Sequence, residues 1–253
     1  MSRLARFLLI SCVLCAACSK QDPILPGERF SVFDTGSVRV LSEPAPVSTL
    51  VFPSNVPDPE NKYEQDSDNT VWKISEGARV RLFTGHPTAA HVAGKRRPVA
   101  DRGFVYAGLS TGEVVKINER TRELMWVADV YKPSAMLGGS SILDIVAPVV
   151  IDGGWVYAGG LGGAFCKLRA SDGGKSWCVD LSTGLPFVVA GGMSYIVATD
   201  NHLYAIDSKN GAVYWRAEVK RQAAPELRRL PDETYVVVIA REQFNAESGE
   251  RVK

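Results

Sequence analysis

The sequence APVVIDGGWVYAGGLGGAFCKLRASDGGKSWCVDL, residues 147–181, decides the fold. Four short runs of mostly β-branched and aromatic residues alternate there with Gly- and Asp-rich stretches at 152–154, 159–163 and 172–174. Because Gly and Asp tolerate the backbone conformations of tight turns, the stretch predicts a four-stranded antiparallel meander. The strands are apolar on both faces, so each sheet must be covered on both sides, as in the stacked blades of a propeller.

A motif within this stretch recurs three times in one register. A Tyr in the second strand precedes a Trp by 20 residues, and an aliphatic residue precedes the same Trp by 9. The copies are Tyr106, Ile117 and Trp126; Tyr157, Leu168 and Trp177; and Tyr195, Ile206 and Trp215. Fixed offsets mark an array of one unit that buries its apolar faces only when its neighbours stack on it. We therefore predict an all-β, propeller-like array of about four four-stranded antiparallel blades.

The two ends of the array suggest how it is completed. A fourth unit begins near Glu226, and its Trp would fall at position 253. The segment Thr70–Ile74 (TVWKI) looks like a fourth strand without the three before it. This N-terminal strand would complete the last blade and close a ring; an open arc or completion by a second chain is the alternative.

Residues 1–17 have the pattern of a secretory signal peptide. Arg3 and Arg6 precede an apolar run that is too short to span a bilayer as a mature helix. The sequence Leu14-Cys15-Ala16-Ala17-Cys18 is similar to a bacterial lipobox, although Cys15 stands where Leu is usual. We predict lipidation of Cys18, with an ordinary signal peptide as the alternative. Ser19 after the Cys favours, by the lipoprotein sorting rule, the periplasmic face of the outer membrane.

Residues 18–68 are rich in Pro and in acidic or small residues, which predicts a lipid anchor and an extended tether. The repeats then occupy residues 69–253. The formal net charge is +1, and it becomes −1 without Arg3 and Arg6. Such a balance gives no reason to expect a nucleic-acid partner.

Two cysteines fall in adjacent strands of one blade, in a compartment that permits disulfides. They are Cys166 and Cys178. The turn at 172–174 does not fix the hairpin register, so a disulfide and two buried thiols both fit the sequence.

No group of residues in the sequence predicts catalysis. Residues 108–112 (GLSTG) match a nucleophile motif, but they lie between two strands rather than between a strand and a helix. The three histidines are scattered, with no Cys or carboxylate at metal-ligand spacing. Asp172, Asp200 and Asp207 sit where carboxylates cap turn amides. We therefore expect no enzyme activity, no metal site and no cofactor.

The repeated unit resembles the PQQ-type repeat, which quinoprotein dehydrogenases share with the BamB family of the outer-membrane β-barrel assembly machine. The lipobox and the runs at 143–150 (LDIVAPVV) and 186–191 (PFVVAG) are similar to the BamB family. The similarity covers most of residues 90–253, but it matches only the later blades of the family's ring. The resemblance therefore implies a shortened array.

This resemblance implies a non-catalytic outer-membrane lipoprotein scaffold that aids the assembly and insertion of β-barrel proteins. Its partner would be the periplasmic domains of the barrel-forming, BamA-like subunit. The family's contact loops fall on residues 90–98 and on the segment before Ala147, although Ala93 and Ile145 replace family residues there. The candidate partner-binding residues are Val92, Arg96, Arg97 and Asp144.

We hypothesise that Asp144, Arg96 and Arg97 form one charged rim; ordinary solvated loop charges are the alternative. For the whole protein, one alternative is a lipoprotein that serves another envelope interaction. A quinoprotein dehydrogenase is a further alternative, but its calcium ion and acidic base would need a complete ring.

Overall fold

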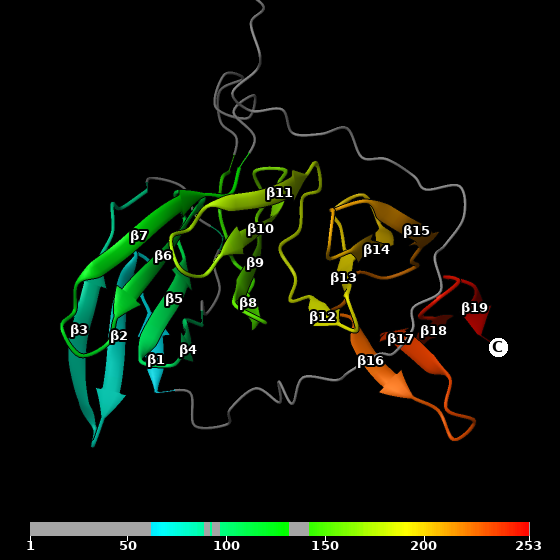
Figure 1. The fold of residues 1–253 in the computed structure, drawn as a ribbon, viewed down its shortest axis with the longest axis horizontal. Coiled ribbons are helices and arrows are strands. Elements are labelled where there is room, and N and C mark those ends of the chain that lie inside the picture. The colour runs from blue at the N-terminus through cyan, green and yellow to red at the C-terminus, as the bar shows by residue number, and fades with distance from the viewer. Residues whose placement is uncertain (1–61, 89–91, 93–96, 132–141, 253) are drawn as a thin grey trace, which may run out of the picture. The chain divides into compact units, whose positions relative to one another are not determined.

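The computed structural model describes residues 62–88, 92, 97–131 and 142–252, all of which belong to one compact unit, residues 35–253. Within these residues the regular secondary structure is β-strand, arranged in five antiparallel sheets, and no helix is present (Figure 1). The all-β prediction is confirmed. The predicted signal peptide, Cys18 and most of the predicted tether lie outside the described residues.

Sheet 1 has three strands and sheets 2 to 5 have four each. Sheet 1 contains β1 (Tyr63–Gln65), β2 (Thr70–Ser75) and β3 (Ala78–Thr84). Sheet 2 contains β4 (Val99–Asp101), β5 (Phe104–Gly108), β6 (Glu113–Asn118) and β7 (Leu124–Asp129). Sheet 3 contains β8 (Val150–Asp152), β9 (Trp155–Gly159), β10 (Phe165–Arg169) and β11 (Lys175–Val179). Sheet 4 contains β12 (Val188–Ala190), β13 (Met193–Val197), β14 (His202–Asp207) and β15 (Val213–Glu218). Sheet 5 contains β16 (Glu226–Arg229), β17 (Tyr235–Ile239), β18 (Glu242–Asn245) and β19 (Arg251–Val252).

Consecutive strands are hydrogen-bonded neighbours in every sheet, so the predicted four-stranded meanders are confirmed. Sheet 1 is an additional, three-stranded member of the array. Its strand β1 falls within the stretch 18–68 that we expected to be tether. The repeat region therefore includes residues before 69.

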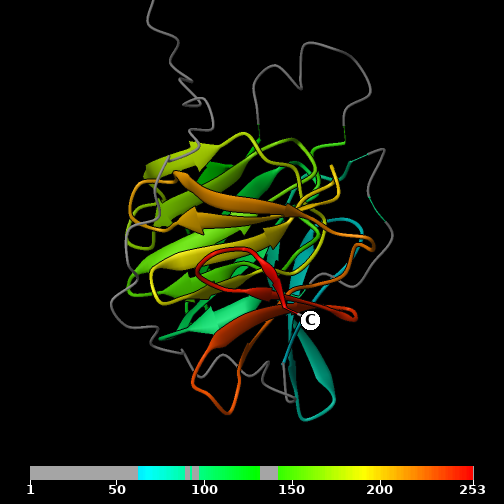
Figure 2. The same ribbon diagram turned by 90° about the vertical axis from the view of Figure 1, so that its right-hand side faces the viewer.

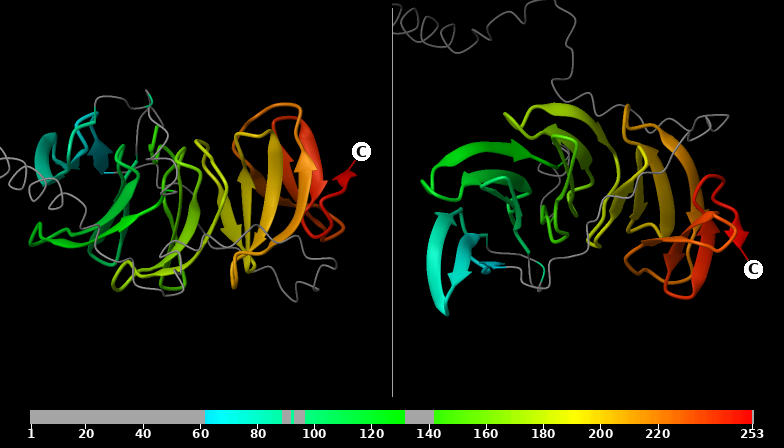
Figure 3. Two further views of the ribbon diagram at one scale, coloured as in Figure 1. Left: turned by 90° about the horizontal axis from the view of Figure 1, so that it is seen from above. Right: turned by 60° about the horizontal axis from the view of Figure 1, so that its bottom comes forward.

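Successive sheets pack face to face in chain order (Figures 1 and 3). Each large apolar cluster combines residues of two neighbouring sheets; one, for example, joins Tyr106 and Trp126 of sheet 2 to Val156 and Leu168 of sheet 3. Equivalent clusters join sheets 3 and 4 and sheets 4 and 5. Sheet 5 faces the viewer in Figure 2. Sheets 2, 3 and 4 each have a neighbouring sheet on both faces, which explains why their inner strands are largely apolar.

Each repeated Trp reaches from its own sheet onto the next one. The indole N–H groups of Trp126, Trp177 and Trp215 donate to main-chain carbonyls of the following sheet at 3.2, 3.2 and 3.1 Å. The acceptors belong to Ala170, Ser208 and Ala246. The indole rings lie against glycines in the turn between the third and fourth strands of the following sheet: Gly173, Gly211 and Gly249. We call each of these contacts a Trp–Gly junction.

Two buried lysines strengthen the first two Trp–Gly junctions. Lys116 Nζ donates to Ala170 O at 2.7 Å, and Lys167 Nζ donates to Ser208 O at 2.6 Å. These carbonyls also accept from the indoles. Burial lowers the pKa of both lysines. The sequence alone does not single out these two residues, because a Lys side chain is usually exposed to solvent.

The strand register identifies which strands of sheet 1 correspond to those of the other sheets. In sheets 2, 3 and 4 the register between the third and fourth strands shifts by one residue, and the Trp pairs with the residue just before the shift. The same shift occurs between β2 and β3, where Val71 pairs with Phe83. Phe83 therefore occupies the Trp position, and β1, β2 and β3 correspond to second, third and fourth strands.

The expectation that Thr70–Ile74 completes the last blade is wrong. These residues belong to β2, which is hydrogen-bonded to β1 on one side and β3 on the other. With both edges of β2 already paired, no edge is left for another sheet. The fourth strand of sheet 5 is instead β19.

Sheet 1 is held to sheet 2 by an apolar cluster and by polar contacts. Lys73 Nζ forms an ion pair with Glu119 Oε1 at 2.6 Å. The buried Asn69 donates to His86 O at 2.7 Å and to Ser110 Oγ at 2.8 Å, and it accepts from the Ser110 N–H. Side-chain hydrogen bonds therefore contribute strongly at this junction.

Cys166 lies directly opposite Cys178 across β10 and β11. The structure joins the two residues by a disulfide, with the Cα atoms 4.1 Å apart. The hairpin register, which the sequence did not fix, brings them together.

Candidate interaction edge

The candidate site lies at one edge of the array, which we call the connection edge. It consists of the connections that enter each sheet and the turns between the second and third strands. In an antiparallel meander these segments lie at the same end of the strands. The described residues of the connections are 85–88, 92, 97–98, 130–131, 142–149, 180–187 and 219–225, and those of the turns are 66–69, 109–112, 160–164, 198–201 and 240–241.

Main-chain hydrogen bonds fix the connections between the turns of successive sheets. The N–H of Ile145 donates to Leu109 O at 3.2 Å, and the N–H of Leu161 donates to Asp144 O at 3.0 Å. The next connection repeats the pattern: Thr183 donates to Gly160 O at 3.1 Å, and Thr199 donates to Ser182 O at 2.9 Å. Residues 144–145 and 182–183 are thus equivalent and held in place.

The structure brings together two of the predicted site residues. The backbone N–H of Val92 donates to Asp144 Oδ2 at 2.7 Å. Asp144 is fully buried, and Val92 is half-buried. The side chain of Asp144 therefore ties the connection into sheet 2 to the connection into sheet 3.

The hypothesis of a single charged rim needs revision at Asp144. Its carboxylate points inside and accepts a main-chain hydrogen bond, so it is not part of an exposed rim in this structure. Arg97 is exposed, as expected. Arg96 and Cys18 lie outside the described residues.

The connection that contains Asp144 also carries apolar side chains that were not among the predicted site residues. Ile142 is 41% exposed, and Leu143 and Tyr131 are half-buried. Leu143 and Tyr131 cover two glycines of the neighbouring turns, Gly112 and Gly162, where an added Cβ would come within 2.7 to 2.9 Å of them. Burial, followed by the nearby charge of Asp129, raises the pKa of Tyr131. The sequence does carry a signal for an interaction site here, namely an Ile and a Leu within a connection. Loop residues rarely need to be apolar for packing.

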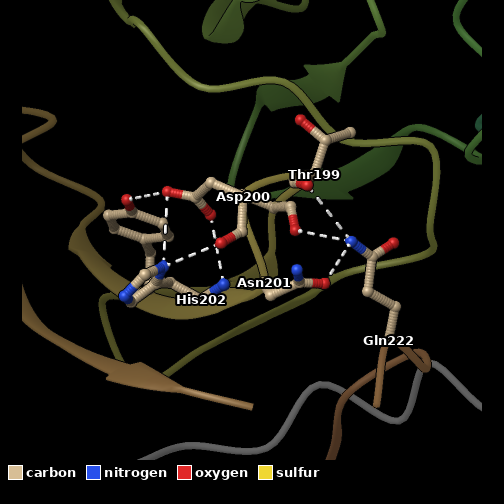
Figure 4. Close-up of polar contacts among 7 residues, drawn as sticks. Thr199, Asp200, Asn201, His202 and Gln222 are labelled. Carbon is tan, nitrogen blue, oxygen red and sulfur yellow. Dashed lines mark hydrogen bonds and ion pairs between the residues drawn. The ribbon is translucent and has the colours of Figure 1, made fainter. Parts of the chain in front are cut away.

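A polar cluster lies farther along the same edge, in the turn after β13 (Figure 4). Asp200 Oδ1 accepts from the N–H of His202 at 3.1 Å, and Asp200 Oδ2 accepts from the Tyr204 hydroxyl at 2.6 Å. Burial, and then the bond to Asp200, raises the pKa of Tyr204. The Gln222 amide donates to Asn201 Oδ1 at 2.9 Å and approaches two main-chain carbonyls of the turn. Asp200 thus caps the turn, as predicted, and Gln222 ties the next connection to it.

Within the part of the chain that the structure describes, no three His, Cys, Asp or Glu side chains are placed to hold a metal ion. The same part contains no helix that would be long and apolar enough to span a bilayer. Among its described residues, the connection edge presents the exposed apolar side chain of Ile142 and the exposed charge of Arg97.

A sequence model of the family described as outer membrane protein assembly factor BamB matches residues 37–217 and 138–251. Among curated proteins, the outer membrane protein assembly factor BamB of Kangiella koreensis is 26% identical over 145 residues, which cover 57% of this chain and 37% of that protein. The chain spans about a third to two fifths of the length of the curated relatives it matches.

Solved structures also resemble the chain. The crystal structure of BamB from Moraxella catarrhalis matches with a TM-score of 0.46 and 16% identity, covering 81% of this chain and 67% of that chain. The quinohemoprotein alcohol dehydrogenase ADHIIG from Pseudomonas putida HK5 matches with a TM-score of 0.57 and 14% identity, covering 76% of this chain and 40% of that chain. The second likeness is one of fold.

Proposed function

Because the chain belongs to the outer membrane protein assembly factor BamB family, we propose that it is a non-catalytic scaffold for the assembly of β-barrel outer-membrane proteins. It binds the periplasmic domains of the barrel-forming, BamA-like subunit through its connection edge. Lipidation of Cys18 anchors it to the periplasmic face of the outer membrane.

The contact between Val92 and Asp144 carries this proposal. The resemblance assigned partner contacts to two loops, and the hydrogen bond links one residue of each loop across 52 positions of the chain. In the same two segments, Ile142 supplies an exposed apolar side chain and Arg97 supplies an exposed charge. Exposed apolar and Arg side chains are frequent contributors to protein interfaces.

Asp144 acts in this proposal as a positioning residue. Its buried carboxylate holds the backbone of Val92 against the connection that carries Ile142. A partner would therefore meet a preorganised surface, which lowers the entropic cost of binding.

The test is binding of the purified BamA-like periplasmic domains to the full chain, with Ile142→Ser and Arg97→Glu as edge variants. Arg120→Glu is the matched control, because Arg120 is exposed in the turn after β6, at the opposite edge. The proposal expects each edge variant to weaken binding by about 1 kcal/mol or more at unchanged melting temperature. Affinity that is equal for wild type, both edge variants and the control would place the partner site elsewhere.

The anchor is tested separately with Cys18→Ser. Release of the protein from membranes into the soluble periplasm is the expected result. Unchanged sedimentation with membranes would overturn the lipid anchor without bearing on the connection edge.

A further inference from the structure

The junction between sheets 1 and 2 departs from the three Trp–Gly junctions. Phe83 takes the place of the Trp, as the strand register shows. Arg122 takes the place of the Gly. Its backbone N–H donates to the carbonyl oxygen of the residue four positions earlier at 2.8 Å, as do the backbone N–H groups of Gly173 and Gly211. Its φ of +63° also matches the +76° and +75° of those glycines. A non-Gly residue in this conformation is uncommon.

The two replacements belong together. A Cβ at the glycine of the other junctions would lie 2.6 to 2.9 Å from the indole ring, so a Trp and a side chain at that turn cannot coexist. With Phe at position 83 and a Cβ at position 122, the junction between sheets 1 and 2 is not filled by an indole. An open pocket of about 660 Å³ lies there, lined by Arg81, Leu82, Phe83, Thr84, Arg122 and Leu124.

The lining of this pocket combines apolar and cationic groups. Leu82 is buried and Phe83 half-buried, whereas Leu124 is 45% exposed. Arg81 and Arg122 are both exposed, and neither guanidinium has an ion-pair or hydrogen-bond partner among the described residues. A guanidinium binds a carboxylate through two parallel hydrogen bonds and also stacks on aromatic rings.

The apolar surface continues from the pocket along β7. Leu124, Met125 and Val127 of this strand are 45%, 47% and 44% exposed. The strand β7 is at the end of the strand order in sheet 2, so one of its edges is unpaired within that sheet. An exposed edge with apolar side chains is suited to an extended polypeptide rather than to a compact small molecule.

We propose that this pocket binds an acidic polypeptide segment through an aromatic side chain flanked by carboxylates. The ring enters the space that a Trp fills at the other junctions and packs on Leu82, Phe83 and Leu124. The flanking carboxylates pair with Arg81 and Arg122, and the rest of the segment follows β7. This site is distinct from the connection edge, because the turn that contains Arg122 is at the opposite end of the strands.

The probe is a fluorescein-labelled peptide with a Glu-Trp-Glu core, titrated with the full chain and followed by fluorescence anisotropy. Peptides with Glu-Ala-Glu and Lys-Trp-Lys cores test the ring and the charge. The double variant Arg81→Gln with Arg122→Gln should bind the Glu-Trp-Glu peptide about tenfold more weakly or worse. The control double variant Arg120→Gln with Arg221→Gln removes two exposed arginines outside the pocket lining and should change affinity by less than about twofold.

A second variant fills the pocket. Phe83→Trp with Arg122→Gly rebuilds the pairing of the other junctions, so it should raise the melting temperature and abolish peptide binding. Arg122→Gly alone removes one charge but leaves the pocket open, and it should retain weak binding.

Several results would overturn the proposal. These are no saturable binding of the Glu-Trp-Glu peptide up to about 1 mM, equal binding of the Lys-Trp-Lys peptide, and undiminished binding by the filled variant. Phosphatidylglycerol vesicles that bind through Arg81 and Arg122, without any peptide binding, would assign the pocket to a lipid instead.

Discussion

The indole ring of Trp177 lies directly on Gly211 of the following sheet, where an added Cβ would be 2.8 Å from the ring atom Cδ2. The same glycine has a φ of +75°. Gly is thus required at this turn for two independent reasons, the backbone conformation and the space above it. The contact repeats at Trp126 with Gly173 and at Trp215 with Gly249, so it is the unit from which the array is built.

Gly211→Ala should destabilise the protein by about 2 kcal/mol or more, since it adds a steric clash with Trp177 to the conformational strain. Gly192→Ala is the matched control. Gly192 has a φ of +81°, and nothing lies within 4 Å of an added Cβ. That variant should cost only about 1 kcal/mol. Urea unfolding measures both, and equal costs would contradict the Trp–Gly junction.

Trp177→Ala should cost about 3–5 kcal/mol, as expected for a large aromatic side chain packed between two sheets. Trp177→Phe should cost less, because the Ser208 carbonyl keeps its hydrogen bond from Lys167. A loss below about 1 kcal/mol for the Ala variant would mean that the indole contributes little packing. Thermal and urea unfolding of the three proteins distinguish these outcomes.

Asp144→Ala should destabilise the connection edge by about 1–3 kcal/mol, since it leaves the Val92 N–H without its acceptor. Asp144→Asn retains an acceptor oxygen and should cost less. Hydrogen exchange at the Val92 amide is the direct measurement. Unchanged protection in the Ala variant would show that the bond does not hold this loop.

The ion pair between Lys73 and Glu119 should make stability depend on pH. The hydrogen bond from Lys73 lowers the pKa of Glu119 below its ordinary value. A carboxyl group with a depressed folded-state pKa contributes its full stability above its unfolded pKa of about 4.3, and loses it as pH falls through the folded value. Glu119→Gln should therefore be less stable than wild type by about 0.5–1 kcal/mol near neutral pH, discounted for partial exposure. The difference should shrink towards pH 3, and a difference that is constant from pH 3 to 7 would argue against the pair.

The disulfide between Cys166 and Cys178 closes a short loop, with a sequence separation of 12. Cross-linking such a loop restricts the unfolded chain, so Cys166→Ser with Cys178→Ser should lower stability by about 2–3 kcal/mol. The same loss should follow reduction of the wild-type protein. Thiol titration of the unfolded, unreduced protein checks the bond itself, and two free thiols from these residues would contradict it.

The sequence by itself determined the unit and its repetition. The spacing from Tyr157 to Trp177 recurs because each of these residues must meet the same neighbours in every sheet, and Tyr157 indeed packs beside Trp177 with ring centroids 6.2 Å apart. Gly and Asp mark the turns, since few other residues accept those backbone angles. Local constraints of this kind depend on residues that are close in the sequence, so they can be predicted from it.

Only the tertiary structure shows the partners of residues that lie far apart in the chain or whose sequence pattern fits more than one role. Thr70–Ile74 has the composition of a strand, but only the hydrogen-bonding partners of β2 show which sheet it joins. Asp144 was expected to be an exposed charge, yet the fold buries it against Val92, because a connection is positioned by contacts with other loops. The hairpin register places Cys166 opposite Cys178. Where Phe83 and Arg122 stand in place of a Trp and a Gly, a pocket lies between sheets 1 and 2. These outcomes depend on residues far apart in the chain, which composition and spacing do not relate to one another.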